Sequence, residues 1–179
     1  KINKKEDNLD IEPYYENFKG DIVKIDSNKY LIKGKYDIIS SDSIRVTELP
    51  IGKWTTQFIE ELEVLMDDKN KKTKKAVVKN IKDMSTDALV DITIKFHPAV
   101  LGKLVSKRVD KYTNQLEKTL KLYCYKSTTN MNLFNSKQQL KKYETVYDII
   151  DDYYGIRYDL YIKRKEYMIS NLEKIVMEL

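Results

Sequence analysis

Histidine and cysteine each occur only once in these 179 residues, which leaves few ways to build a catalytic site. A Ser-His-Asp or Cys-His site would depend on His97 as its base, and no nucleophile motif accompanies that histidine. The paired Cys and His spacings of zinc sites are missing. The five glycines are scattered rather than gathered in a phosphate-binding loop. We therefore expect no catalytic residue and no bound metal or cofactor in this chain.

Long apolar runs are missing as well. No stretch approaches the ~18–20 apolar residues that a membrane-spanning helix needs, so we expect no membrane partner. The single cysteine, Cys124, cannot form a disulfide within the chain, which favours a reducing, intracellular compartment. Cys124 lies among alternating apolar residues, which predicts a packing role rather than a reactive one.

Basic residues exceed acidic ones by five in the whole chain, and they are unevenly distributed. Residues 1–50 contain nine basic and ten acidic side chains, whereas residues 98–129 contain seven basic and two acidic ones. This distribution favours a surface that faces a polyanion, although exposed lysines often only keep a protein soluble. Lysines are also dense in residues 67–75, which we interpret as a solvated loop, with a DNA-contacting loop as the alternative.

Runs of β-forming residues predict most of the strands. Three such runs, separated by turn residues, are interpreted as an antiparallel meander: residues 20–25, 30–36 and 43–49. A later strand is expected at residues 89–96, and a last pair of strands at 119–125 and 131–134. The predicted fold class is α+β, with an antiparallel sheet built from the meander and the later strands, packed helices and a long C-terminal helix.

Helical spacing of apolar residues predicts a helix over residues 55–66, in which Phe58 faces the core. Trp54 comes just before this helix, and we expect it to be buried and to anchor the helix on the meander. Shorter helices are expected at residues 78–84 and 99–106.

One long helix is predicted from residue 145 to the end, because its apolar residues keep a helical period throughout. Thr145 is the expected N-cap, and Asp148 places negative charge in the first turn, where the helix dipole favours it. We expect the first half of this helix to pack on the domain through four residues: Ile149, Ile150, Tyr153 and Leu160.

Four motifs follow one another in a recognisable order and spacing. They are TELPIGKWT at residues 47–55, KL at 121–122 with NMNLF at 130–134, LKKY at 140–143, and YGIR at 154–157 leading to YIKRK at 161–165. Together they resemble the part of eukaryotic-type and viral type IIA DNA topoisomerases that follows the catalytic winged-helix domain. That part is the tower and the first long helix toward the dimer-closing C-gate. The resemblance covers roughly Glu12 to the end of the chain.

The resemblance implies a polar leader at residues 1–11, a tower-like domain at 12–144, and a long helix at 145–179 that begins a coiled-coil arm. It also implies a non-catalytic piece of an ATP-dependent type II topoisomerase, an enzyme that relaxes supercoils by double-strand passage. In the family the nucleophilic tyrosine, the metal-binding carboxylates and the ATPase all lie upstream. ATP and Mg²⁺ are therefore implied for the parent enzyme, which is a homodimer of the nucleus, or of a viral factory or virion.

The resemblance further identifies a strand that contacts duplex DNA beside the cleavage site, without sequence preference. Its residues here are Lys121, Leu122, Tyr123, Cys124, Tyr125, Lys126, Ser127, Thr128, Thr129 and Asn130. Their chemistry suits the task, because lysines neutralise phosphates and hydroxyl or amide groups donate to phosphate oxygens. Strand alternation predicts that Leu122 and Cys124 share one face, with Lys121, Tyr123 and Tyr125 on the other.

A different class of function stays open from the residues alone. The chain could be a freestanding interaction module whose long C-terminal helix pairs with a partner helix, with no nucleic acid involved. Salt-dependent duplex binding separates the two hypotheses, because only a phosphate-contacting surface loses affinity linearly in the logarithm of salt concentration.

Overall fold

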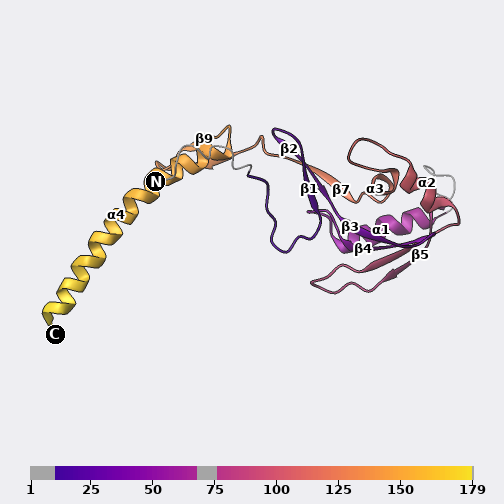
Figure 1. The fold of residues 1–179 in the computed structure, drawn as a ribbon, viewed down its shortest axis with the longest axis horizontal. Helices are drawn as coiled ribbons and strands as arrows, with labels where there is room; N and C mark the ends of the chain where they lie inside the picture. Colours follow the sequence, from indigo (N-terminus) through magenta and orange to yellow (C-terminus); the bar gives the residue numbers. More distant parts are fainter. Residues whose placement is uncertain (1–10, 68–75, 179) are drawn as a thin grey trace. The chain divides into compact units, whose positions relative to one another are not determined.

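The computed structural model describes residues 11–67 and 76–178, which fall into two compact units, one from Glu12 to Ser127 and one from Thr128 onward (Figure 1). Nearly all of the predicted polar leader and of the lysine-rich loop lies outside the described residues. The fold class is as predicted: antiparallel sheets, a few helices and a long C-terminal helix. Each unit is described by itself below.

Two antiparallel sheets form the first unit. The smaller sheet has the order β1-β2-β7, from strands Asp21–Asp26, Lys29–Lys33 and Tyr123–Ser127. The larger sheet has the order β3-β4-β6-β5, from strands Lys35–Ser40, Ser43–Glu48, Ile92–Phe96 and Val78–Asp83. In β4, Ile44 and Val46 point inward and are fully buried, as the alternation in the sequence predicts.

The predicted single meander is wrong, because the chain passes from one sheet to the other at Gly34. β2 ends at Lys33 and β3 begins at Lys35, so the expected strand at residues 30–36 is two strands. The Gly34 amide donates to the Leu122 carbonyl at 2.9 Å. A Cβ atom on Gly34 would lie 2.4 Å from the carbonyl oxygen of Glu48, so a larger residue would force the strands apart.

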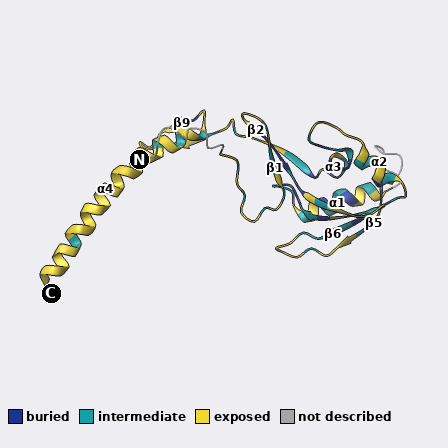
Figure 2. Cartoon of the chain, viewed as in Figure 1, coloured by how far each residue is buried: buried dark blue, intermediate teal, exposed yellow. Residues whose placement is uncertain are grey.

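Three helices complete this unit: α1 (Thr55–Met66), α2 (Val100–Ser106) and α3 (Gln115–Thr119). The core is a cluster in which Phe58 and Leu62 of α1 and Leu116 of α3 pack with the inner residues of the larger sheet. Figure 2 shows the buried side of α1. Sequence reasoning missed α3, although Asn114 and Glu117 have the spacing of a capping box and form one here.

The helix predicted at residues 78–84 is a strand, β5, which pairs with β6. Its register shifts between Val78 and Asn80, so that one extra residue, Lys79, is accommodated in a bulge. The bulge lets Val78 and Ile81 both turn toward the core cluster although they are three residues apart. That spacing is the one that resembled a helix.

Trp54 is exposed over 78% of its surface, contrary to the prediction that it lies in the core. It precedes Phe58 by four residues, which suggested a shared helical face. However, Trp54 is the N-cap of α1 and has extended backbone angles, φ −85° and ψ 147°. Its side chain therefore does not follow the rotation of the helix, whereas Phe58 and Leu62 do and are fully buried.

The second unit contains a short hairpin and the long helix. β8 (Asn132–Phe134) pairs with β9 (Leu140–Lys142), and α4 spans Val146–Glu178. The predicted pairing of residues 119–125 with 131–134 is wrong, because β7 pairs with β2 and β8 pairs with β9. A turn closed by hydrogen bonds between Asn135 and Gln138 or Gln139 brings β8 and β9 together locally.

The start of α4 is as predicted. The Thr145 hydroxyl accepts the Asp148 amide at 3.2 Å, and the Asp148 carboxylate accepts the Thr145 amide at 2.9 Å. Hydrogen bonding of the Asp148 carboxylate to the Thr145 side chain, and next to the Thr145 amide, lowers the pKa of Asp148. The reciprocal pair satisfies donors that the first turn leaves unpaired.

Packing along α4 is weaker than expected. Ile149 is half-buried, but Ile150, Tyr153 and Leu160 are exposed. No described residue of α4 is fully buried (Figure 2). Among the described residues, no helix combines the length and apolar character needed to cross a membrane.

Candidate nucleic-acid interface

The strand predicted to contact DNA is β7, one of the two outer strands of the smaller sheet. Its register with β2 aligns Tyr123 with Lys33, Tyr125 with Leu31, and Ser127 with Lys29. Leu122 comes just before the strand and is fully buried, so it anchors the strand rather than facing a ligand. The exposed part of β7 is its second half, Tyr125, Lys126 and Ser127.

Side chains of β7 divide between two faces of the sheet, as the alternation predicts. One face, which we call the tyrosine face, carries Tyr123, Tyr125 and Ser127 together with Lys29 and Lys33 of β2. The opposite face carries Cys124 and Lys126. The candidate residues therefore do not form one continuous row, and a ligand on the tyrosine face meets a different set of groups from a ligand beside Lys126.

Aromatic rings and a lysine meet on the tyrosine face. The rings of Tyr123 and Tyr125 pack edge to face with centroids 5.7 Å apart, and the Lys29 Nζ lies 4.5 Å from the centroid of the Tyr125 ring. Burial, with a contribution from the charge of Asp110, raises the pKa of Tyr125, so its hydroxyl stays a neutral donor at physiological pH. Sequence reasoning missed Lys29, because only the strand pairing brings it beside β7.

Lys121 lies outside β7, in a turn with a positive φ of 52°. Its Nζ contacts the Glu61 carboxylate at 2.9 Å, and the Lys53 Nζ contacts the other oxygen of the same carboxylate. Burial tends to raise the pKa of Glu61, but the hydrogen bonds from Lys53 and Lys121 outweigh it and lower the pKa. Two cations thus share one anion, and only part of the charge of Lys121 is available to a ligand.

Lys126 and Cys124 lie beside the turn that leads into α1. The Lys126 Nζ would lie 3.8 Å from a Cβ on Gly52, and the Cys124 sulfur lies 3.5 Å from the Ile51 carbonyl oxygen. Within the described part of the chain, Lys126 has no acidic partner. Burial raises the pKa of the Cys124 thiol, although the nearby Lys126 opposes this. A protonated, half-buried thiol suits the packing role predicted for Cys124.

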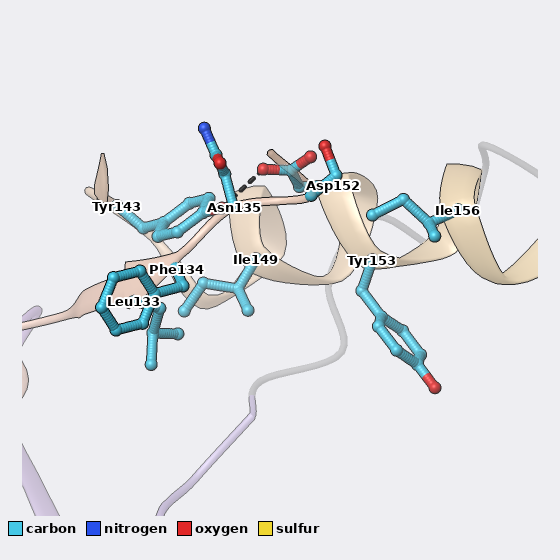
Figure 3. Close-up of a pocket in the computed structure, with 9 residues that line it drawn as sticks. Leu133, Phe134, Asn135, Tyr143, Ile149, Asp152, Tyr153 and Ile156 are labelled. Atoms are coloured by element: carbon cyan, nitrogen blue, oxygen red, sulfur yellow. Dashed lines mark hydrogen bonds between the residues drawn. The ribbon is translucent and has the colours of Figure 1, made fainter. Parts of the chain in front are cut away.

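The remaining candidates, Thr128, Thr129 and Asn130, belong to the second unit. They precede the β8–β9 hairpin, which contacts the first turns of α4. Figure 3 shows the hollow formed there, a cavity of about 210 Å³ whose lining includes Phe134, Ile149 and Tyr153. The Tyr143 hydroxyl donates to Asp152 at 2.5 Å and closes one side. This hydrogen bond raises the pKa of Tyr143.

The family resemblance implies Mg²⁺ for the parent enzyme, but these residues do not fit a metal ion. Within residues 11–67 and 76–178, no group of three or more His, Cys, Asp or Glu side chains is placed to hold one.

Comparisons with known proteins agree with one another. The family model of the A-type subunit of DNA gyrase/topoisomerase IV matches residues 1–179. DNA topoisomerase 2 of Pisum sativum is 31% identical over 173 residues, which cover 96% of this chain and 11% of that protein. DNA topoisomerase 2 of Acanthamoeba polyphaga mimivirus is 30% identical over 217 residues, which cover 92% of this chain and 17% of that protein.

The fold is similar to that of a solved topoisomerase. The crystal structure of the Plasmodium falciparum topoisomerase II DNA-binding, cleavage and re-ligation domain matches 90% of this chain and 21% of its own, with 36% identity and a TM-score of 0.76. The chain thus spans about a tenth to a fifth of the length of these relatives. Because the family model covers its whole length, the chain belongs to the family of DNA gyrase/topoisomerase IV A-type subunits, within the type IIA DNA topoisomerases.

Proposed function

We propose that this chain is the tower of a type IIA DNA topoisomerase with the start of the long helix that leads to the C-gate. The order of motifs supports this assignment, as does the similarity to the Plasmodium falciparum domain at 36% identity. In this role the chain is non-catalytic. It binds the duplex beside the cleavage site and links the DNA gate to the C-gate.

The observation that carries the DNA-binding role is the exposed, basic and aromatic end of β7. On one face of this strand end Lys126 has no acidic partner among the described residues, and on the opposite face Lys29 lies over the Tyr125 ring. The Tyr125 hydroxyl adds a neutral donor on the same face as Lys29. Lysines and hydroxyl groups contact phosphate oxygens without reading bases, so we propose binding that is indifferent to sequence.

The parent enzyme is proposed to be a homodimer that uses ATP and Mg²⁺ to pass one duplex through another. These properties come from the family resemblance, and no residue of this chain is assigned to them. Relatives from a plant and from mimivirus support a nuclear location, or a viral factory or virion, for the parent enzyme.

The purified chain is expected to show no supercoil relaxation, no cleavage and no ATPase activity, because the groups that the family uses for each step lie outside it. The measurement is relaxation of a negatively supercoiled plasmid with ATP and Mg²⁺, with a full-length topoisomerase as positive control. Relaxation that co-purifies with the chain over two columns would contradict the non-catalytic role.

Replacing Lys121 and Lys126 together with alanine should weaken duplex binding equally for two unrelated sequences. Log affinity falls as log salt concentration rises, and each lost phosphate contact makes this fall less steep by about 0.9. We expect that full decrease for Lys126 and a smaller one for Lys121, because Glu61 already neutralises part of its charge. Fluorescence anisotropy of the two labelled duplexes at several salt concentrations measures the slope for the wild type and for the double variant.

The matched control is Lys79→Ala with Lys82→Ala, which removes the same charge from β5 in the larger sheet. A general loss of positive charge would lower the salt slope in both double variants. An unchanged slope for the Lys121 and Lys126 variant in the isolated chain and in the full-length enzyme would exclude this strand as a DNA contact.

The long helix favours a second candidate function, a protein-interaction module without nucleic acid. α4 exposes apolar side chains along its length, among them Leu160, Leu172 and Val176. An exposed apolar stripe of this length is typical of a helix that pairs with a partner. The same salt titration separates the two candidates, because such a module would bind no duplex.

A further inference from the structure

The loop between α2 and α3 carries positive charge that the proposed DNA-binding strand does not include (Figure 1). Lys107, Arg108 and Lys111 are all exposed, and Asp110 is the loop's only acidic residue. The loop therefore presents two excess positive charges within six residues. What it can bind depends on where Asp110 points, on how rigid the loop is, and on which face of the sheet it lies against.

Asp110 is directed at the backbone of the loop. One of its carboxylate oxygens accepts the amides of Tyr112 and Thr113, each at 2.7 Å. These bonds, led by the one from Tyr112, lower the pKa of Asp110. The carboxylate is thus engaged in shaping the loop, and it is not hydrogen-bonded or ion-paired to Arg108 or Lys111.

Side chains on three neighbouring elements of the first unit hold the loop in place. The Lys33 Nζ donates to the Tyr112 carbonyl at 3.0 Å and contacts the buried Glu117 carboxylate at 2.6 Å. The Asn114 side-chain amide donates to the Tyr36 hydroxyl at 3.0 Å. A surface that is already ordered loses less conformational entropy when a ligand binds, so its charges contribute more to affinity.

The loop lies against the tyrosine face of β7. Lys33, which holds the Tyr112 carbonyl, is the register partner of Tyr123. Asp110 is close enough to Tyr125 for its charge to help raise the pKa of that tyrosine, after burial. Lys29 packs on the ring of the same Tyr125. The Lys111 Nζ lies 5.3 Å from the centroid of the Tyr112 ring, so this part of the loop and Lys29 lie at opposite ends of the tyrosine face.

We propose that this loop is a second phosphate-contacting element, in which Arg108 and Lys111 bind the backbone of the same duplex that β7 engages. The proposal rests on the DNA-binding role proposed above and extends it to a separate segment of the chain. Because Tyr125 lies between Lys29 and the end of the face where Lys33 holds the loop, the proposed path of the duplex backbone crosses Tyr125. The contact reads no base, since these residues provide phosphate-neutralising charge without a groove-entering element.

The test uses Arg108→Gln with Lys111→Gln, which keeps the side-chain stems and removes both charges. Anisotropy of a labelled duplex is measured over a series of salt concentrations, beside the Lys121 and Lys126 variant and the Lys79 and Lys82 control. We expect log affinity to fall less steeply with log salt, by about 1.8 in slope. If the affinities of the variant and the wild type converge at ~1 M salt, the variant then binds about 60-fold more weakly at ~0.1 M salt. A charge-reversing variant, Arg108→Glu with Lys111→Glu, should lose more duplex affinity than the glutamine variant.

The outcomes separate the two proposals. If the wild type binds duplex and the glutamine variant keeps its slope while the Lys121 and Lys126 variant loses it, the loop proposal is overturned and the role of β7 stands. If the wild type binds no duplex in the isolated chain or in the full-length enzyme, both are overturned. If the glutamine variant loses binding to polyglutamate but not to DNA, the loop binds an acidic protein segment, and the proposal is again overturned.

Discussion

Replacing Leu122 with alanine is expected to lower the free energy of unfolding of the first unit by about 2–5 kcal/mol. Leu122 is fully buried in the core cluster, and its carbonyl accepts the Gly34 amide at 2.9 Å. Removing the side chain leaves a cavity directly before β7, where the surrounding residues relax only in part. The two β-sheets of the unit meet beside Leu122, so we expect the loss of stability to affect both sheets.

The measurement is urea unfolding followed by near-ultraviolet circular dichroism, because the helical signal would be dominated by α4 in the other unit. Leu89→Ala is the matched control, since Leu89 is in the same unit but exposed. Surface substitutions of this kind usually change stability by less than about 0.5 kcal/mol. Equal midpoints for the two variants would mean that Leu122 does not anchor the strand.

Local patterns in the sequence predict the elements whose side chains repeat regularly. Ile44 and Val46 alternate in the strand Ser43–Glu48, and both are buried. The helix Thr55–Met66 and the cap at Thr145 follow from the spacing of apolar residues and from the reach of a threonine hydroxyl. In each case the interaction that decides the structure is local, so it can be read from a few neighbouring residues.

Elements decided by distant contacts were predicted wrongly. The strand Val78–Asp83 resembles a helix because its bulge places Val78 and Ile81 on one side, and only pairing with β6 makes it a strand. Gly34 redirects the chain because β4 passes close to it. Trp54 was predicted wrongly for a local reason: as the N-cap of α1 it has extended backbone angles, so its side chain leaves the helical face that Phe58 follows. None of these causes leaves a periodic signal in the sequence.

The candidate interface divides in the same way. Alternation alone places Tyr123 and Tyr125 on one face of β7, and the structure agrees. The roles of Lys29 and of Glu61 could not be predicted, because one joins the site by strand pairing and the other by an ion pair across 60 residues. The basic loop was visible only as an excess of charge in residues 98–129.

The second large effect is expected for Glu117→Ala, which removes a buried carboxylate that two groups depend on. Glu117 is 5% exposed, contacts the Lys33 Nζ at 2.6 Å and accepts the Asn114 amide at 3.0 Å. The substitution leaves the poorly exposed ammonium group of Lys33 without its anion and breaks the capping box of α3. Losing one partner of a buried ion pair typically costs about 3–5 kcal/mol.

The expected loss is toward the lower end of that range, because Lys33 keeps its hydrogen bond to the Tyr112 carbonyl. Asp91→Ala is the control, since it also removes an anion from an ion pair, but the Arg45–Asp91 pair is exposed and such pairs contribute about 0.2–1 kcal/mol. Glu117→Gln should fall between the two, because it keeps an acceptor for the Asn114 amide but no charge for Lys33. If the Glu117→Ala and Asp91→Ala variants unfold at the same urea concentration, the Lys33–Glu117 pair does not stabilise the unit. If Glu117→Ala also leaves amide hydrogen exchange in residues 107–114 unchanged, the Lys33–Glu117 pair does not order the loop between α2 and α3 either.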